Sequence, residues 1–150
     1  MKFENRTNDP RFDAAISEAE SLLSINSPLM ELVEDKNDWK YNTNMFGVQV
    51  AFTLSQDSIK PLSVNLYTPD RKTSAIGYYD GAVSMFFNKK VLDSLREDDF
   101  MEVVVPNLIH EWAHYKGFNH GTGIFRNYKT KRKCNYSVPY YISENAKKFL

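Results

Sequence analysis

The sequence predicts a single α+β domain, and three observations lead to that prediction. The chain has 150 residues, which is the length of one ordinary domain. Hydrophobic residues make up 42% of it and charged residues 25%, which is the composition of a folded globular protein. A helical spacing of apolar residues comes first, an alternating spacing follows, and a helical spacing returns near residue 100. We find no repeat or linker that would divide residues 1–150 into two units.

The N-terminal part is expected to be helical after a short polar start. Residues 1–8 are polar, and we expect them to be frayed. A helix is expected to begin at Asp9-Pro10, because Asp is a good capping residue and Pro fits the first turn. Apolar residues then share one face as far as Ser24, namely Phe12, Ile16, Ala19 and Leu23. A short turn of helix is expected over residues 28–34.

The middle of the chain changes to the two-residue period of half-buried strands. This alternation predicts one strand over residues 48–54 and a second over residues 62–67. The dipeptide Asp80-Gly81 then separates two aromatic-rich runs and is a strong signal for a tight hairpin. The two runs are residues 74–79 and 82–88. Together these strands predict a small mixed sheet.

A longer helix is expected over residues 99–116. Pro106 interrupts its pattern, so the helix either starts near this residue or bends there. Gly117 follows in the position of a left-handed C-terminal cap. Residues 121–136 are expected to form a basic loop, and residues 142–150 a closing helix.

Charge, cysteine content and hydropathy exclude several classes of protein. The chain has 19 basic and 19 acidic residues, so bulk charge does not attract it to nucleic acid or to anionic membranes. The single cysteine, Cys134, cannot form an internal disulfide. The first residues lack the apolar stretch of a secretory signal, and no run approaches the roughly 18 apolar residues of a membrane span. We therefore expect a cytoplasmic protein without a membrane partner.

The three histidines of the sequence lie within eleven residues, at His110, His114 and His120. His110 and His114 are four residues apart on the predicted helix, so both imidazoles can reach one metal ion. A sharp turn at Gly117 can bring His120 back as a third nitrogen ligand. Three neutral imidazoles with one open position are typical of a catalytic zinc site, whereas a structural site would be closed by a fourth protein ligand. The spacing therefore predicts one Zn²⁺ per chain.

Glu111 follows the first predicted ligand directly. One step along a helix turns a side chain by about 100°, so Glu111 can lie beside the metal without binding it. From that position it can accept a proton from the attacking water and pass it to a leaving amine. Glu111 is therefore the candidate general base.

Residues 110–120 match the pattern His-Glu-x-x-His-x-x-Gly-x-x-His at every fixed position. This segment resembles the extended zinc signature of the metzincin-type metallopeptidases within the zincins. The resemblance covers 11 of the 150 residues. It implies a zincin-like domain with a small mixed sheet, an N-terminal helix and a zinc-binding active-site helix. It also implies a zinc metallopeptidase.

The resemblance extends in part to the segment Ser137–Tyr141. Metzincins carry a methionine turn of the pattern Ser-x-Met-x-Tyr beneath the metal. Ser137 and Tyr141 match this pattern, whereas Pro139 stands in place of the methionine. A phenol near the metal could hydrogen-bond the oxyanion of a tetrahedral intermediate, and the candidates are Tyr136, Tyr140 and Tyr141. Tyr141 fits the family register, Tyr140 could serve if Pro139 alters the turn, and the alternative for each is packing against the core.

Together these features predict a zinc-dependent hydrolase that cleaves peptide bonds. An extended peptide could pair with the sheet edge near residues 74–79. A zinc hydrolase that acts on a non-peptide amide or ester is a second interpretation. A third is a zinc-containing binding module that uses the basic loop 126–133 for nucleic acid or a partner protein. We expect that loop to be a solvated surface and do not expect nucleic acid binding.

Overall fold

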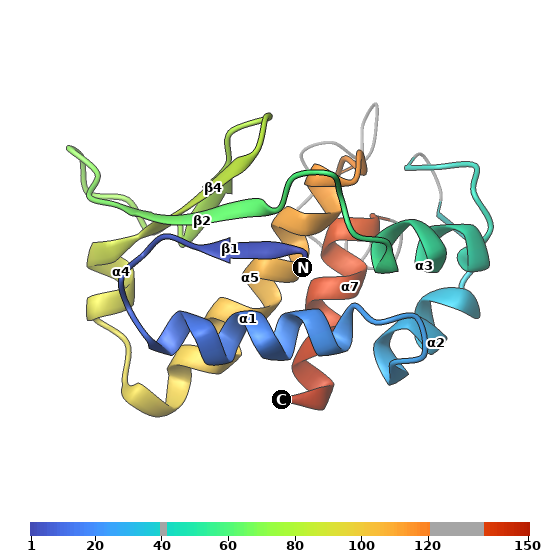
Figure 1. The fold of residues 1–150 in the computed structure, drawn as a ribbon, viewed down its shortest axis with the longest axis horizontal. Helices are drawn as coiled ribbons and strands as arrows, with labels where there is room; N and C mark the ends of the chain where they lie inside the picture. The colour runs from blue at the N-terminus through green and yellow to red at the C-terminus, as the bar shows by residue number, and fades with distance from the viewer. Residues whose placement is uncertain (40–41, 121–136) are drawn as a thin grey trace.

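The computed structural model describes residues 1–39, 42–120 and 137–150 and shows a mixed sheet with helices beneath it and at one end (Figure 1). The α+β class and the small mixed sheet are thus confirmed. The elements follow in the order β1 (Phe3–Asn5), α1 (Arg11–Leu22), α2 (Pro28–Glu34), α3 (Gly47–Ser55), β2 (Leu62–Tyr67), β3 (Gly77–Tyr79), β4 (Ser84–Asn88), α4 (Lys89–Asp93), the 3₁₀ turn η1 (Glu97–Asp99), α5 (Phe100–Tyr115), α7 (Val138–Ala146) and the 3₁₀ turn η3 (Lys147–Phe149).

The sheet has the strand order β1-β2-β4-β3. The strands β1, β2 and β4 are parallel to one another, whereas β3 is antiparallel to β4. The turn between β3 and β4 uses Gly81 at φ 82°. The Asp80 carboxylate accepts hydrogen bonds there from the backbone N–H groups of Ala82 and Ser84. The predicted strand over residues 62–67 and the hairpin are therefore confirmed, and β3 forms one edge of the described sheet.

The expectation of a frayed N-terminus is wrong. Residues Phe3–Asn5 form β1, which pairs in parallel with β2. The Phe3 ring is buried and lies 5.4 Å from the ring of Trp112, and the Phe3 N–H donates to Glu20 of α1 at 3.1 Å. No alternating pattern indicates this strand, because its pairing partner β2 lies far along the chain.

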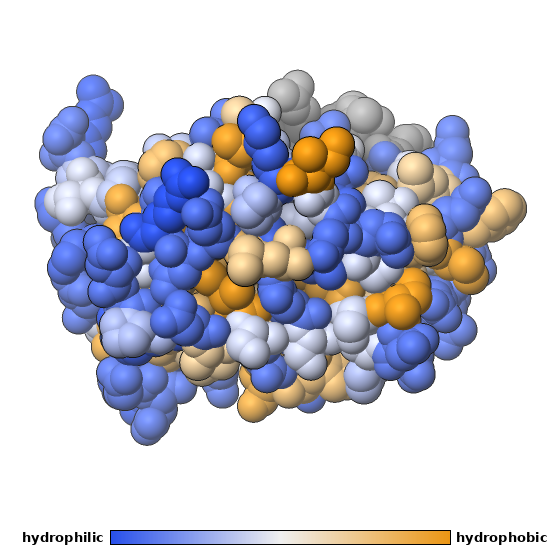
Figure 2. Space-filling view, viewed as in Figure 1, coloured by the Kyte–Doolittle hydropathy of each residue, from blue (hydrophilic) through white to orange (hydrophobic). Residues whose placement is uncertain are grey.

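The strand expected over residues 48–54 is also wrong, because this segment is the helix α3. Its buried apolar residues are Val50, Ala51 and Leu54, which recur at helical spacing. Val48 and Phe52 instead lie on the outer face, 61% and 58% exposed. Apolar side chains gather at the end of the molecule formed by α2 and α3 (Figure 2). The apolar residues that alternate in sequence lie on two faces of the helix: Val50 and Leu54 are buried, whereas Val48 and Phe52 are exposed.

Gly47, the first residue of α3, lies against the end of α2. A Cβ at this position would meet the backbone carbonyl oxygens of Val33, Glu34 and Lys36. We therefore expect Gly47→Ala to lower the free energy of unfolding by about 3 kcal/mol, as overpacking does. Urea unfolding measures this effect. Gly81→Ala is the control, because a Cβ there meets nothing within 4 Å and costs only the strain of a positive φ, about 1–2 kcal/mol. A smaller loss at Gly47 than at Gly81 would contradict the packing argument.

The helix expected over residues 99–116 is confirmed as α5, with Pro106 inside it. Its core face includes Trp112, which is fully buried and whose Nε1 donates to the Leu54 carbonyl of α3 at 2.8 Å. The closing helix α7 begins at Val138 rather than at residue 142 and packs along α5. No helix in the described part of the chain is long and apolar enough to cross a membrane.

Candidate metal centre

The predicted turn after α5 is present at Gly117, which has φ 96°. The Gly117 N–H donates to the His114 carbonyl, and the Phe118 N–H donates to the Ala113 carbonyl at 3.0 Å. These are the two hydrogen bonds of a Schellman motif, which ends a helix and reverses the chain. The apolar residue after the glycine, Phe118, is buried. The reversal brings His120 back toward the helix face that carries the other two histidines.

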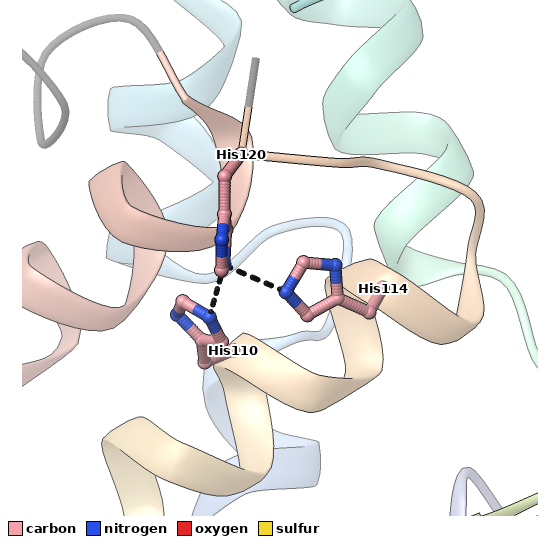
Figure 3. A group of neighbouring side chains, drawn as sticks. All are labelled: His110, His114 and His120. Atoms are coloured by element: carbon pink, nitrogen blue, oxygen red, sulfur yellow. Dashed lines mark hydrogen bonds between the residues drawn. The ribbon is translucent and has the colours of Figure 1, made fainter. Parts of the chain in front are cut away.

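The three histidines converge through their Nε2 atoms (Figure 3). The Nε2 atom of His120 lies 2.9 Å from that of His110 and 2.8 Å from that of His114. One ligand atom from each residue lies within 4.8 Å of the others, so this group could hold a metal ion. In the described part of the chain the group consists of these three side chains. The structure thus brings together all three histidines that the sequence predicted as ligands.

The second ring nitrogens of two histidines are held by their surroundings. The Nδ1 atom of His114 lies 2.7 Å from the Phe118 carbonyl oxygen. Only a protonated nitrogen can donate to a carbonyl, so the lone pair of this ring is on Nε2. The Nδ1 atom of His110 lies 3.4 Å from the Ser143 hydroxyl of α7, and this ring also hydrogen-bonds the Pro139 backbone. Both rings are therefore oriented from outside the histidine group.

The environment keeps the imidazoles of His110 and His114 neutral. Burial, together with the neighbouring histidines, lowers the pKa of His110 to about 3. Burial also lowers the pKa of His114. A metal ion binds imidazole only in its neutral form, so protons do not compete for these nitrogens near neutral pH. The donor set fits a metal ion that prefers nitrogen ligands, such as Zn²⁺.

Glu111 lies beside the histidine group and is only 7% exposed. Burial raises the pKa of its carboxyl to about 7, and a hydrogen bond from the Tyr79 backbone acts in the opposite direction. A carboxyl with this pKa can exchange a proton near neutral pH. A cation held by the histidines would lower that pKa, because it favours the ionised carboxylate.

A cleft of about 460 Å³ opens beside this group. Its walls come from α5, from α7 and from the start of the edge strand β3, and His110, Glu111 and His120 all line it. Apolar contributions come from Ile76 and Pro106. A ligand in the cleft would therefore contact His110, His120 and Glu111 at the same time.

Of the three candidate tyrosines, the structure places Tyr140 at the histidines. Its ring centroid lies 4.9 Å from that of His110 and 4.6 Å from that of His120, and the residue lines the cleft. Tyr141 packs instead against the buried ring of Trp39, at 5.3 Å. Tyr136, the basic loop 126–133 and Cys134 lie outside the described residues. Tyr141, which fits the family register, thus packs against Trp39, whereas Tyr140 packs against the histidines.

Two residues near the centre carry no signal in the sequence. Ser143 faces His110 from α7, and Asn42 hydrogen-bonds the chain on both sides of the undescribed segment 121–136. Both reach the centre only through tertiary packing, so no local pattern could have indicated them. A comparison of this chain with protein-family models, curated proteins and solved structures gave no match.

Proposed function

We propose that this chain is a zincin-like, zinc-dependent hydrolase that cleaves peptide bonds. The observation that supports the proposal best is the convergence of three Nε2 atoms at a cleft that a buried carboxyl also lines. His110, His114 and His120 would hold one Zn²⁺. When bound, zinc would supply Lewis-acid activation of the water and of the scissile carbonyl.

Glu111 would act as the general base. Its carboxylate lies at the cleft, next to a ligand in sequence but outside the group of potential ligands. There it would accept a proton from the attacking water and donate it to the leaving amine. Burial keeps bulk water from competing for this carboxylate, and the Tyr79 backbone contact restricts its position.

Tyr140 would assist at the developing negative charge. Its ring lies against His110 and His120, and it lines the cleft. A phenol in this region can donate a hydrogen bond to an oxyanion, which stabilises a tetrahedral intermediate more than the substrate.

The edge strand β3 supports a peptide as the substrate. It is the last strand of the described sheet, and Gly77 and the preceding Ile76 line the cleft. An extended peptide can add to such an edge through main-chain hydrogen bonds. This arrangement would place the peptide across the cleft beside Glu111. The sheet edge near residues 74–79 is the one that the sequence suggested for peptide pairing.

The proposal is tested by metal analysis followed by a cleavage screen. Protein purified without added metal is expected to contain about one zinc per chain, because three ligand nitrogens are already oriented. A peptide library analysed by mass spectrometry should show cleavage that a chelator abolishes and added zinc restores. Less than a tenth of an equivalent of zinc, with no uptake on titration, would exclude the metal site. Zinc binding without cleavage of any peptide would favour a non-peptide substrate or a binding module.

A further inference from the structure

His120 is the one histidine of the three that no helix or strand carries. His110 and His114 are held by the backbone hydrogen bonds of α5, so their spacing is a property of that helix. The position of His120 depends instead on what holds residues 118–120. Phe118 is held by its burial and by its hydrogen bond to the end of α5. The residue between them, Asn119, is exposed.

The side chain of Asn42 hydrogen-bonds the backbone at two places that are distant in sequence. Its Nδ2 donates to the carbonyl oxygen of Asn119, the residue directly before His120. Its Oδ1 accepts from the N–H of Val138 at 2.9 Å, 96 residues away in sequence. The Asn42 side chain thus connects Asn119, the residue before the third histidine, with the first residue of α7.

Asn42 caps the N-terminus of α7 from outside the helix. Ser137 stands at the N-cap position, but its side chain makes no capping hydrogen bond. The N–H groups of the first helical turn need acceptors from outside the helix, and Asn42 supplies one of them. Asn42 is itself held, because its own N–H donates to the carbonyl of buried Trp39 at 2.9 Å.

The start of α7 also orients the other side of the centre. The Pro139 backbone and the Ser143 hydroxyl face His110, and the Tyr140 ring packs against both His110 and His120. The Asn42 side chain therefore connects the backbone just before the third ligand with the helix whose first turn orients His110.

We propose that Asn42 is a positioning residue of the metal centre, which acts on metal affinity through His120. This role rests on the metal site of the proposed function and does not depend on hydrolysis. Its consequence is specific. Loss of Asn42 should weaken metal binding only in a protein that still has His120 as a ligand.

A double-mutant cycle tests this coupling. Zinc affinity is measured by chelator competition for the native protein, Asn42→Ala, His120→Ala and the double variant. Asn42→Ala is expected to weaken zinc binding about 10- to 100-fold, as loss of an outer contact to a ligand does. In the His120→Ala background the same change is expected to cost less than about 3-fold. An equal loss in both backgrounds, or native affinity in Asn42→Ala, would overturn the proposal.

Two further variants separate positioning from a general loss of stability. Asn44→Ala is the matched control, because this exposed asparagine lies two residues away and should leave zinc affinity unchanged. Asn42→Asp keeps an acceptor for the Val138 N–H but loses the donor to Asn119. It should keep the thermal stability of the metal-free protein and still weaken zinc binding, and it replaces Asn42→Ala in the cycle if that variant does not fold. A native protein that binds no zinc would refute the metal centre as well, whereas native binding with unaffected variants would refute only the role of Asn42.

Discussion

Glu111→Gln is expected to leave zinc bound and to lower the turnover of a peptide substrate by at least about 10²-fold, the lower end of what a general base contributes. Glutamine keeps the size of the side chain and can still accept a hydrogen bond from the Tyr79 backbone. It cannot accept a proton from water. Because Glu111 lies outside the histidine group, zinc content should not change. Steady-state kinetics and metal analysis of the same preparation measure both effects.

Glu102→Gln is the matched control for this variant. Glu102 lies on the same helix and lines the same cleft, eight residues before His110. The substitution removes the same charge without touching the proposed base, so turnover should stay within a few-fold of the native value. Loss of zinc from Glu111→Gln would mean that Glu111 is a ligand. Retained zinc with full activity would mean that another group is the base.

Single substitutions of His110, His114 and His120 by alanine should each weaken zinc binding by more than about 10²-fold. The physical reason is that loss of a ligand removes a metal–nitrogen bond, which costs more than the 10- to 100-fold typical of outer contacts. Chelator competition measures the affinity, and far-UV circular dichroism shows whether the helices are kept. Peptide cleavage should fall in parallel with zinc occupancy.

Asn107→Ala is the control for these three variants. Asn107 lines the cleft three residues before His110, and its amide donates to the Val103 carbonyl at 2.8 Å rather than to the histidine group. Its loss should leave zinc affinity unchanged. If one of the three histidine variants also kept native affinity, the site would have only two protein ligands. The match to the extended zinc signature would then have predicted one ligand wrongly.

The candidate site could be predicted because its main parts are local in sequence. His110 and His114 share a helix face by spacing alone, and Gly117 predicts the reversal that returns His120. The strand β2, the β3–β4 hairpin and α5 were predicted for the same reason, since periodicity and turn chemistry act over a few residues. The sequence by itself therefore determined which side chains could meet a metal ion.

Only the tertiary structure decided how that group is surrounded. The alternation of residues 48–54 suited a strand, yet contacts with α2 and with Trp112 bury one face of a helix there. Phe3 became part of a strand because it pairs with Leu62. The selection of Tyr140 over Tyr141 and the contact of Asn42 with α7 also depend on where α7 lies. Contacts across tens of residues leave no periodic trace, because they are set by which apolar faces can be buried together once the chain has folded.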